Sequence, residues 1–534
     1  MVTKLRDKWT IAALLIAYVC IQSYCLQRLT INYDEGLFSY YGTTLLKLEG
    51  DKDIVKFDSK LPITALNMLP RAVVQLFHPG LKRTDAYKDI MMGRYVSLLV
   101  ALLLALLIYH WSALLYGTKA GLASFIIFLL CPNFLAHGVF VSSDIFACLF
   151  MTASLYFLWQ FSQAGQTKHW LMTSGCVALA QITKFSMIHL FIVFPLLVAV
   201  MYFLKGRIFP GKPFNKIKLI KLLLLFAGIN WLVICAAHLF YGMFIPLNNY
   251  TFRSGTLQHL QAFLRGAGKY LPVPFPSSYI QSLDMVIYLD HLGAGQAGSS
   301  QGSLYITGNS SRYGFWYYYF VVLWYKLPLS VLLVLGASFY LYIKKWNKFI
   351  FVKNELYLLV PVIYFLIYMS FFYSTQIGIR HILIILPLLY VFAGFLFQQA
   401  YNYRAARYLV YASVLYQCIS VGIFFPHFLP YTNEMITDKK MAYKKIADTN
   451  LCYGEGGRFL QTYLQQHPGA KYLPPVICSG KIVMEVNEML NIDIATVGKY
   501  NWVNGLTPSD HIHSQYLIFD ISPALADSLA KVHF

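Results

Sequence analysis

Charged residues are scarce in this chain, and acidic residues are the scarcest of all. Only 12% of the 534 residues are charged, and 23 Asp and Glu stand against 43 Lys and Arg. Hydrophobic residues make up 58% of the chain and the mean hydropathy is +0.54, which excludes an ordinary soluble protein. We therefore expect a polytopic membrane protein.

The cysteines carry no metal or redox motif. There is no CxxC pair and no His/Cys cluster with zinc spacing among the nine cysteines. Most of them fall in apolar segments, where Cys packs as a small apolar residue. Cys452 and Cys478 lie in the C-terminal tail and would pair only in an oxidising compartment, so the paired and unpaired states both stay open. No cleavage site follows the first apolar segment, which we interpret as a retained anchor.

Apolar windows recur at lengths that fit a membrane, since a helix needs about 20 apolar residues to cross roughly 30 Å of hydrocarbon. They lie at 10–28, 92–116, 119–137, 140–162, 169–184, 186–204, 219–241, 315–343, 355–373, 379–399 and 408–426. The fold class expected from them is an all-α polytopic membrane protein with about eleven transmembrane helices.

Lys and Arg gather in four short segments that predict the orientation. These basic residues are Lys4, Arg6 and Lys8; Lys205, Arg207, Lys212, Lys216, Lys218 and Lys221; Lys344, Lys345, Lys348 and Lys353; and Arg404 and Arg407. With a cytoplasmic N-terminus, eleven spans place all four clusters in the cytoplasm. The net charge of +20 then reflects topology and contact with anionic membrane lipids. Nucleic-acid binding is not expected, because the basic residues form no continuous stripe.

The same count divides the chain into a transmembrane domain, 1–426, with outer loops at 29–91 and 242–313, and a soluble extracytoplasmic domain, 427–534. In the first loop, apolar residues on one side of 37–48 and of 66–77 predict two helices in the interface plane. The Gly-rich stretch 293–298 in the second loop is typical of a mobile loop or lid. In the tail, helices at 457–466 and 483–490 and a strand at 515–519 predict a small α/β domain.

Two adjacent carboxylates, Asp34 and Glu35, follow the first apolar segment. Acids beside the hydrocarbon are costly to desolvate and usually serve chemistry or ion binding. The alternative for Asp34 is an N-cap of the following helix, because Asp is a favoured capping residue. The same alternative applies to Asp144, which begins the fourth span.

Nine short motifs occur in a characteristic order along residues 10 to 465. They are Tyr33-Asp34-Glu35, Lys60-Leu61-Pro62, Gly93-Arg94, Pro132 to Gly138 with Ser142-Ser143-Asp144, Thr183 to Ser186, Gly314 to Tyr319 with Lys326-Leu327-Pro328, Gly378 to His381, Pro387, and Phe425 to Glu434. This order resembles the protein O-mannosyltransferase and aminoarabinose-transferase superfamily of GT-C glycosyltransferases, and most closely its bacterial phospholipid-carrier-dependent type. Two segments depart from the pattern: Lys60-Leu61-Pro62 keeps one proline of the usual two, and Asp448 to Gly456 carries Cys452 and Tyr453 where relatives have Asp and Trp.

The resemblance implies an integral membrane glycosyltransferase, a hexosyl- or pentosyltransferase, in the bacterial cytoplasmic (inner) membrane. It would transfer a sugar, with inversion, from a polyprenyl-phosphate-linked monosaccharide to a lipid, glycan or protein acceptor on the periplasmic side. Such chemistry needs a general base for the acceptor and fixed cations for the leaving phosphate. The residues implied are Asp34 as base, Glu35 as its support or alternate, Asp144 as a second acid, and Lys60, Arg380, Arg94 and His381 at the donor phosphate. Asp34 and Asp144 would also suit a divalent metal ion.

Other interpretations stay open for these residues and for the whole chain. Lys and Arg near span ends often extend to lipid phosphates instead, and Lys184 and Lys326 are interpreted as such anchors. A transporter or lipid flippase is the alternative function, although transporters tend to place acids at mid-membrane and to show two related halves. A third possibility is an inactive relative whose tail is a binding module.

Overall fold

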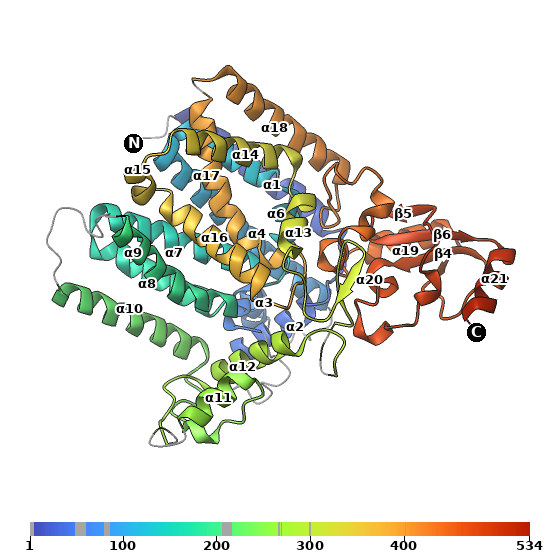
Figure 1. Cartoon of the computed structure of the whole chain (residues 1–534), viewed down its shortest axis with the longest axis horizontal. Coiled ribbons are helices and arrows are strands. Elements are labelled where there is room, and N and C mark those ends of the chain that lie inside the picture. The colour runs from blue at the N-terminus through green and yellow to red at the C-terminus, as the bar shows by residue number, and fades with distance from the viewer. Residues whose placement is uncertain are drawn as a thin grey trace.

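The computed structural model describes residues 5–533 except 48–59, 79–85, 205–215, 265–267, 269, 298, 300 and 401. It is predominantly helical, with the helical bundle at one end and a small sheet in the C-terminal part at the other (Figure 1). This confirms the expected fold class. Lys4 and the first part of the basic connection at 205–215 lie outside the described residues.

The helices of the bundle occupy all eleven expected windows. They are α1 (Leu5–Leu26), α4 (Ala86–Tyr116), α5 (Thr118–Leu129), α6 (Pro132–His137), α7 (Asp144–Ala164), α8 (Thr167–Gln181), α9 (Leu190–Phe203), α10 (Lys216–Ala237), α13 (Tyr318–Lys326), α14 (Leu329–Lys344), α16 (Leu356–Phe371), α17 (Leu386–Gln399) and α18 (Arg404–Phe424), with the short α15 (Lys348–Lys353) beside them. Five described helices are long and apolar enough to span a membrane: α1, α4, α7, α10 and α18. The chain is an integral membrane protein, and the count of eleven spans stays a prediction.

One expected span, 315–343, is not a straight helix. It consists of α13 and α14, which are bent by 114° relative to each other. Pro328 lies at the break, where it lacks the N–H that would continue the helix. The prediction of a single continuous helix was therefore wrong here.

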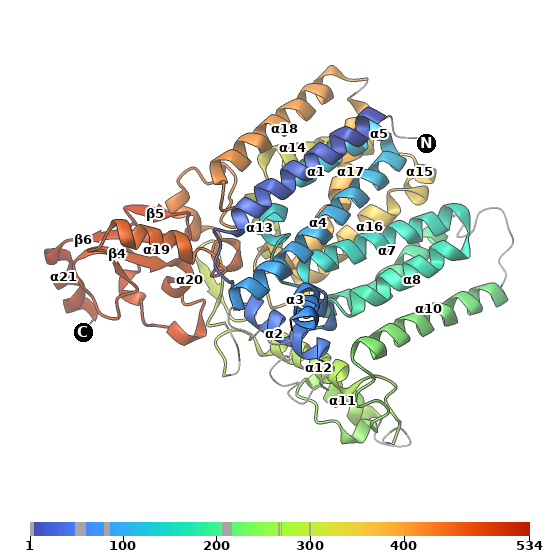
Figure 2. The same ribbon diagram turned by 180° about the vertical axis from the view of Figure 1, so that it is seen from behind.

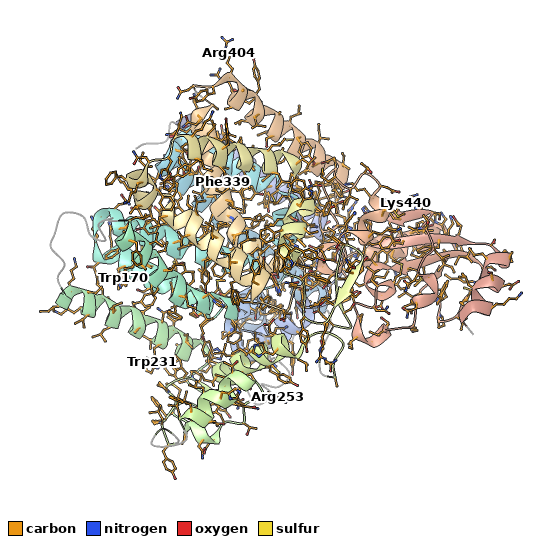
Figure 3. All side chains as sticks on the ribbon, viewed as in Figure 1. Trp170, Trp231, Arg253, Phe339, Arg404 and Lys440 are labelled. Carbon is orange, nitrogen blue, oxygen red and sulfur yellow. The ribbon has the colours of Figure 1, made fainter. Side chains whose placement is uncertain are left out.

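Helix α17 lies at the centre of the bundle and packs against α4, α5 and α14. Twelve of its fourteen residues are buried, as expected for a helix that is apolar on all sides and surrounded by others. Arg404, at the start of α18, lies far from Lys440 in the C-terminal part, and α18 runs from Arg404 toward that part (Figure 3). The basic residues at this end of α18 therefore lie away from the C-terminal sheet.

The outer segments contain short helices. The two helices expected near the N-terminus are α2 (Glu35–Leu46) and α3 (Ala65–Phe77), which pack against each other and against α4 (Figure 2). The second segment forms α11 (Gly255–Phe263), α12 (Ser277–Leu292) and the antiparallel hairpin β1 (Leu304–Ile306) and β2 (Asn309–Ser311). In the Gly-rich stretch, Gly295 donates its N–H to the carbonyl of Gln301, and Gly302, which follows the stretch, donates to the carbonyl of Ile492 in the tail.

The tail folds around a four-stranded mixed sheet in the order β3-β4-β6-β5. Its elements are α19 (Gly457–Gln466), β3 (Lys471–Tyr472), β4 (Gly480–Glu485), α20 (Val486–Met489), β5 (Asp510–Ile512), β6 (Tyr516–Ile521) and α21 (Pro523–His533). The predicted strand at 515–519 is present, but the predicted helix at 483–490 was wrong over its first half. Ile482 and Val483 pair with β6 instead, and helix begins only at Val486. Cys452 and Cys478 are both free thiols.

Candidate functional site

Charged side chains from five separate segments meet at the end of the bundle that faces the tail. Asp34 lies between α1 and α2, and Asp144 is the first residue of α7. Lys60 and Lys184 precede the 3-10 turns Pro62–Thr64 and Phe185–His189, and Arg380 lies in the turn Ile379–His381 that leads into α17. The sequence predicted four of these five residues as functional.

The side chain of Asp34 does not cap α2. It makes no capping hydrogen bond, and Oδ1 of Asn32 accepts the N–H groups of Asp34 and Glu35 at 3.0 and 2.9 Å. Oδ2 of Asp34 instead accepts hydrogen bonds from Nη1 of Arg380 at 2.8 Å and from the hydroxyl of Tyr453 at 2.6 Å. A quarter of the side chain remains exposed, so an acceptor can reach this carboxylate.

The surroundings keep Asp34 ionised. Burial alone would raise the pKa of its carboxyl, but the positive charges of Arg380 and Lys60 outweigh burial and hold the pKa below its usual value. Lys60 is itself buried, with its ammonium 4.7 Å from the centre of the Phe38 ring. At neutral pH the group is therefore a carboxylate.

Asp144 forms an ion pair with Lys184, whose Nζ lies 2.8 Å from Oδ1. The Asp144 side chain is buried and makes no helix cap, since Ser143 occupies the N-cap position; the N–H of Asp144 donates to the hydroxyl of Ser142 at 3.3 Å. The sequence suggested that Lys184 is a membrane anchor, and its ion pair with Asp144 shows that this interpretation was wrong. The negative charges of both Asp34 and Asp144 act on Arg380 and favour its charged form.

His381 has a different character from its neighbour Arg380. Its side chain is buried and its ring lies 5.6 Å from that of Tyr373. Burial holds the pKa of the imidazole well below its usual value, so the ring is neutral. The donor-phosphate role that the resemblance implied for His381 stays a prediction.

Glu35 and Arg94 lie away from the solvent, although they were predicted at the reaction centre. Both side chains are fully buried, and Nε of Arg94 donates to Oε1 of Glu35 at 2.8 Å. Arg94 also donates to the carbonyl of Thr30 at 2.6 Å. The pair links the loop of Asp34 to α4.

The tail contributes two residues that the sequence did not identify as functional. Tyr453 bonds to Asp34, and its ring faces the guanidinium of Arg380 at 4.7 Å. Asp448 is buried and accepts a hydrogen bond from Gln301 at 3.0 Å, and its charge also acts on Arg380. Both lie in the Asp448 to Gly456 segment. The partial likeness of this segment to the family pattern was the feature of the sequence that could have identified them.

Lys326 joins this segment to the bundle. It is fully buried, and its ammonium donates to the carbonyls of Leu429 at 2.6 Å and Asn450 at 2.8 Å. An interface anchor would extend to lipid, so this interpretation of Lys326 was wrong.

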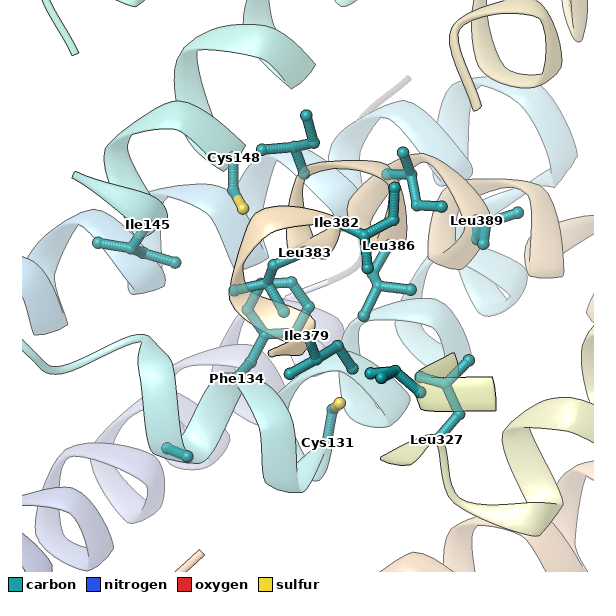
Figure 4. Packing of buried hydrophobic residues seen from close by; sticks show 14 of the residues in the cluster. Cys131, Phe134, Ile145, Cys148, Leu327, Ile379, Ile382, Leu383, Leu386 and Leu389 are labelled. Atoms are coloured by element: carbon teal, nitrogen blue, oxygen red, sulfur yellow. The ribbon is translucent and has the colours of Figure 1, made fainter. Parts of the chain in front are cut away.

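An apolar layer supports the charged cluster from the side of the bundle. Ile145 and Ile379, which neighbour Asp144 and Arg380 in the sequence, pack in one cluster with Phe134 and Leu383 (Figure 4). These side chains exclude water beneath the charges and so strengthen the ion pairs above them.

Asp34 and Asp144 are the two acids that the resemblance suggested for a divalent ion. Among the described residues, no group of three or more His, Cys, Asp or Glu side chains is placed to hold a metal. Oδ2 of Asp34 faces the guanidinium of Arg380, and Oδ1 of Asp144 faces the ammonium of Lys184. A divalent ion shared by these two carboxylates and a donor phosphate stays a prediction.

Comparison with protein families gives one match. A family model described as dolichyl-phosphate-mannose-protein mannosyltransferase matches residues 87–240, which contain α4 to α10. Over that segment the match confirms the resemblance to the GT-C superfamily that the motifs indicated. No curated protein sequence matches the chain.

Solved structures with a similar arrangement share little sequence with it. ArnT from Cupriavidus metallidurans bound to undecaprenyl phosphate is 12% identical with a TM-score of 0.47, over 96% of this chain and 97% of that one. Apo ArnT from the same organism is 12% identical with a TM-score of 0.46, over 73% of this chain and 60% of that one. The oligosaccharyltransferase of Archaeoglobus fulgidus in complex with Zn and sulfate is 12% identical with a TM-score of 0.42, over 85% of this chain and 57% of that one.

Proposed function

We propose that this protein is an integral membrane glycosyltransferase that transfers a sugar from a polyprenyl-phosphate carrier to an acceptor on the non-cytoplasmic face. The observation that carries the proposal is the partly exposed Asp34 carboxylate, held ionised beside Arg380 and Lys60. A general base and fixed cations are the two components that such a transfer requires. The family match over 87–240 supports the same class of enzyme.

The reaction is a single displacement with inversion. The acceptor hydroxyl gives its proton to the Asp34 carboxylate while its oxygen attacks the anomeric carbon of the donor sugar. The bond between that carbon and the phosphate oxygen breaks, and its electron pair leaves with the polyprenyl phosphate. Asp34 then releases the proton to water, which restores the base for the next turnover.

The leaving phosphate is stabilised by cations that the fold has already placed. Arg380 and Lys60 act on the charge of Asp34, and Lys184 lies on the adjacent Asp144. Fixed donors of this kind need no rearrangement as the phosphate gains charge, which lowers the barrier to transfer. The buried Glu35–Arg94 pair holds the loop that carries Asp34 in place. His381 lines the site as a neutral group.

The hydrocarbon tail of the carrier fits a groove between α9 and α16. This groove has a volume of about 300 Å³ and apolar walls, and Tyr368 and Phe372 are among its lining residues. The ring of Tyr368 lies 6.2 Å from that of Tyr373, which in turn lies 5.6 Å from the ring of His381. These aromatic rings connect the lining of the groove with the turn that carries Arg380, where the phosphate of the carrier would lie.

The cellular setting follows from the charge pattern. The basic connections favour a cytoplasmic N-terminus, which places the site and the tail on the periplasmic side of a bacterial inner membrane. The donor sugar would be a hexose or a pentose. The acceptor would be a lipid, a glycan or a protein.

The test is consumption of a radiolabelled polyprenyl-phosphate monosaccharide by the purified protein in nanodiscs, with mannose, arabinose and galactose donors compared. We expect one donor to be consumed by the wild type and consumption to be lost in Asp34→Asn. Glu434→Gln, which neutralises an exposed acid after α18, is the matched control and should retain activity. A protein that moves an intact labelled lipid across the bilayer without cleaving it would be a flippase, and the proposal would fail.

A further inference from the structure

The tail is hydrogen-bonded to the loop that carries the proposed base. Backbone N–H groups of Tyr33 and Thr30 donate to the carbonyls of Tyr453 and Glu455 at 3.1 and 2.8 Å, and the Thr30 hydroxyl donates to the carbonyl of Gly454 at 2.8 Å. Gly454 has φ +84°, and a Cβ at this position would lie 2.8 Å from the ring of Tyr33. A glycine is therefore needed for the two segments to approach so closely.

The side chain of Tyr453 contacts both members of the Asp34–Arg380 ion pair. Its hydroxyl is 2.6 Å from Oδ2 of Asp34, and the carbon of the Arg380 guanidinium lies 4.7 Å from its ring centre. Tyr453 is almost fully buried and packs edge-on against Phe140 at 5.9 Å. Its hydroxyl is thus held in place by packing as well as by hydrogen bonding.

We propose that Tyr453 is a positioning residue through which the C-terminal domain tunes the general base. The inference rests on the proposed function and extends it, since it gives the tail a part in the reaction. The phenol donates to the ionised carboxylate, which favours the charged form of Asp34 and fixes its orientation. Both Tyr453 and Arg380 reach Oδ2, so Oδ1 is the oxygen presented to the acceptor hydroxyl.

Two substitutions at position 453 should move the pH dependence in opposite directions. In Tyr453→Phe the donor is lost and the ring over Arg380 is kept, so Asp34 should hold its proton to higher pH. Loss of a hydrogen bond to a charged group should therefore raise the pKa that sets the acidic limb of kcat against pH by about one to two units. Replacing Tyr453 by 3-fluorotyrosine makes the phenol a stronger donor, which should lower the pKa that sets the acidic limb.

The matched control is Tyr472→Phe, because Tyr472 also donates its hydroxyl to a carboxylate of the tail, that of Glu485, at 2.8 Å. This control should leave the acidic limb where the wild type has it. Thermal unfolding of each variant in detergent separates loss of folded protein from loss of rate. An acidic limb that is unchanged in both Tyr453 variants, or equally shifted in Tyr472→Phe, overturns the inference. If Asp34→Asn keeps its activity, the proposed function itself fails, so the two failures are distinguishable.

Discussion

The guanidinium of Arg94 and the carboxylate of Glu35 form a fully buried ion pair, in which Nε and Oε1 are 2.8 Å apart. The same carboxylate accepts the N–H groups of Val141 and Asn32, both at 3.0 Å. Glu35 therefore joins α2, α4 and the segment before α7. Its neighbour Asp34 turns to the partly exposed side of the same loop, so two adjacent acids serve different purposes.

Removing one partner of this pair should destabilise the fold. In Arg94→Met, Glu35 would be left as a buried charge without its cation, which typically costs about 3–5 kcal/mol of stability. The unfolding temperature in detergent should fall clearly, while the remaining folded protein keeps a measurable rate. Arg404→Met, at the exposed start of α18, is the control and should unfold like the wild type. An unchanged unfolding temperature in Arg94→Met would show that the pair does not stabilise the fold.

Arg380 should behave in the opposite way, with a large effect on rate and a small one on stability. Arg380→Ala removes the donor to Asp34 and a cation for the leaving phosphate, and loss of one such donor typically lowers kcat by about 10²–10³. Arg380→Lys keeps the charge without the planar donor geometry and should lose less. Single-turnover rates with a radiolabelled donor measure both variants. Equal losses in the two would indicate that charge does not matter at this position.

The fold and half of the site follow from local sequence. Long apolar windows predict helices because spanning backbone must satisfy its own hydrogen bonds, and each window is occupied by one helix or two. Asp34 was singled out because acids beside the hydrocarbon are costly to desolvate, and Asp144, Lys60 and Arg380 were implied by the resemblance to the glycosyltransferase superfamily. The bend at Pro328 was missed, because a proline within an apolar window shows that a break is allowed but not how large it is.

The partners of these residues could not be predicted from local sequence. The Asp144–Lys184 pair joins residues 40 positions apart, and the Tyr453–Asp34 bond joins residues 419 apart. The Asp144–Lys184 pair is set by packing within the bundle, and the Tyr453–Asp34 bond by how the tail docks on it. The burial of Arg94 is a similar case, since an arginine near a span end looks the same in sequence whether it meets lipid or a buried glutamate.

The Asp144–Lys184 pair gives a third prediction. Lys184→Met leaves Asp144 buried and without its cation and removes a charge for the donor phosphate, so the KM for donor should rise about tenfold and stability should fall. The double variant Asp144→Asn/Lys184→Met removes both charges and should recover stability but not donor affinity. Unfolding temperature and KM are measured for both single variants and the double variant. Recovery of donor affinity in the double variant would show that Lys184 serves Asp144 alone.

Asp448 gives a prediction about pH. Burial raises the pKa of its carboxyl to about 6, although the N–H of Thr449 and the charge of Arg380 oppose the change. The native state therefore binds this proton more tightly than the unfolded state, in which the pKa is about 4. The stabilisation is fully present below pH 4 and is lost as the pH rises through 6. Over that range the group contributes at most about 3 kcal/mol.

Asp448→Asn should remove this part of the pH dependence, because the amide stays neutral at every pH. The backbone of Asp448 has φ +60°, a conformation that Asn also tolerates, so the substitution adds no backbone strain. Unfolding temperatures of wild type, Asp448→Asn and the exposed control Asp510→Asn are compared from pH 4 to 8. The wild type and the control should lose stability relative to Asp448→Asn as the pH rises from 4 to 6, with a constant difference above pH 7. Parallel curves for all three proteins would show that the Asp448 carboxyl ionises in the fold as it does in water.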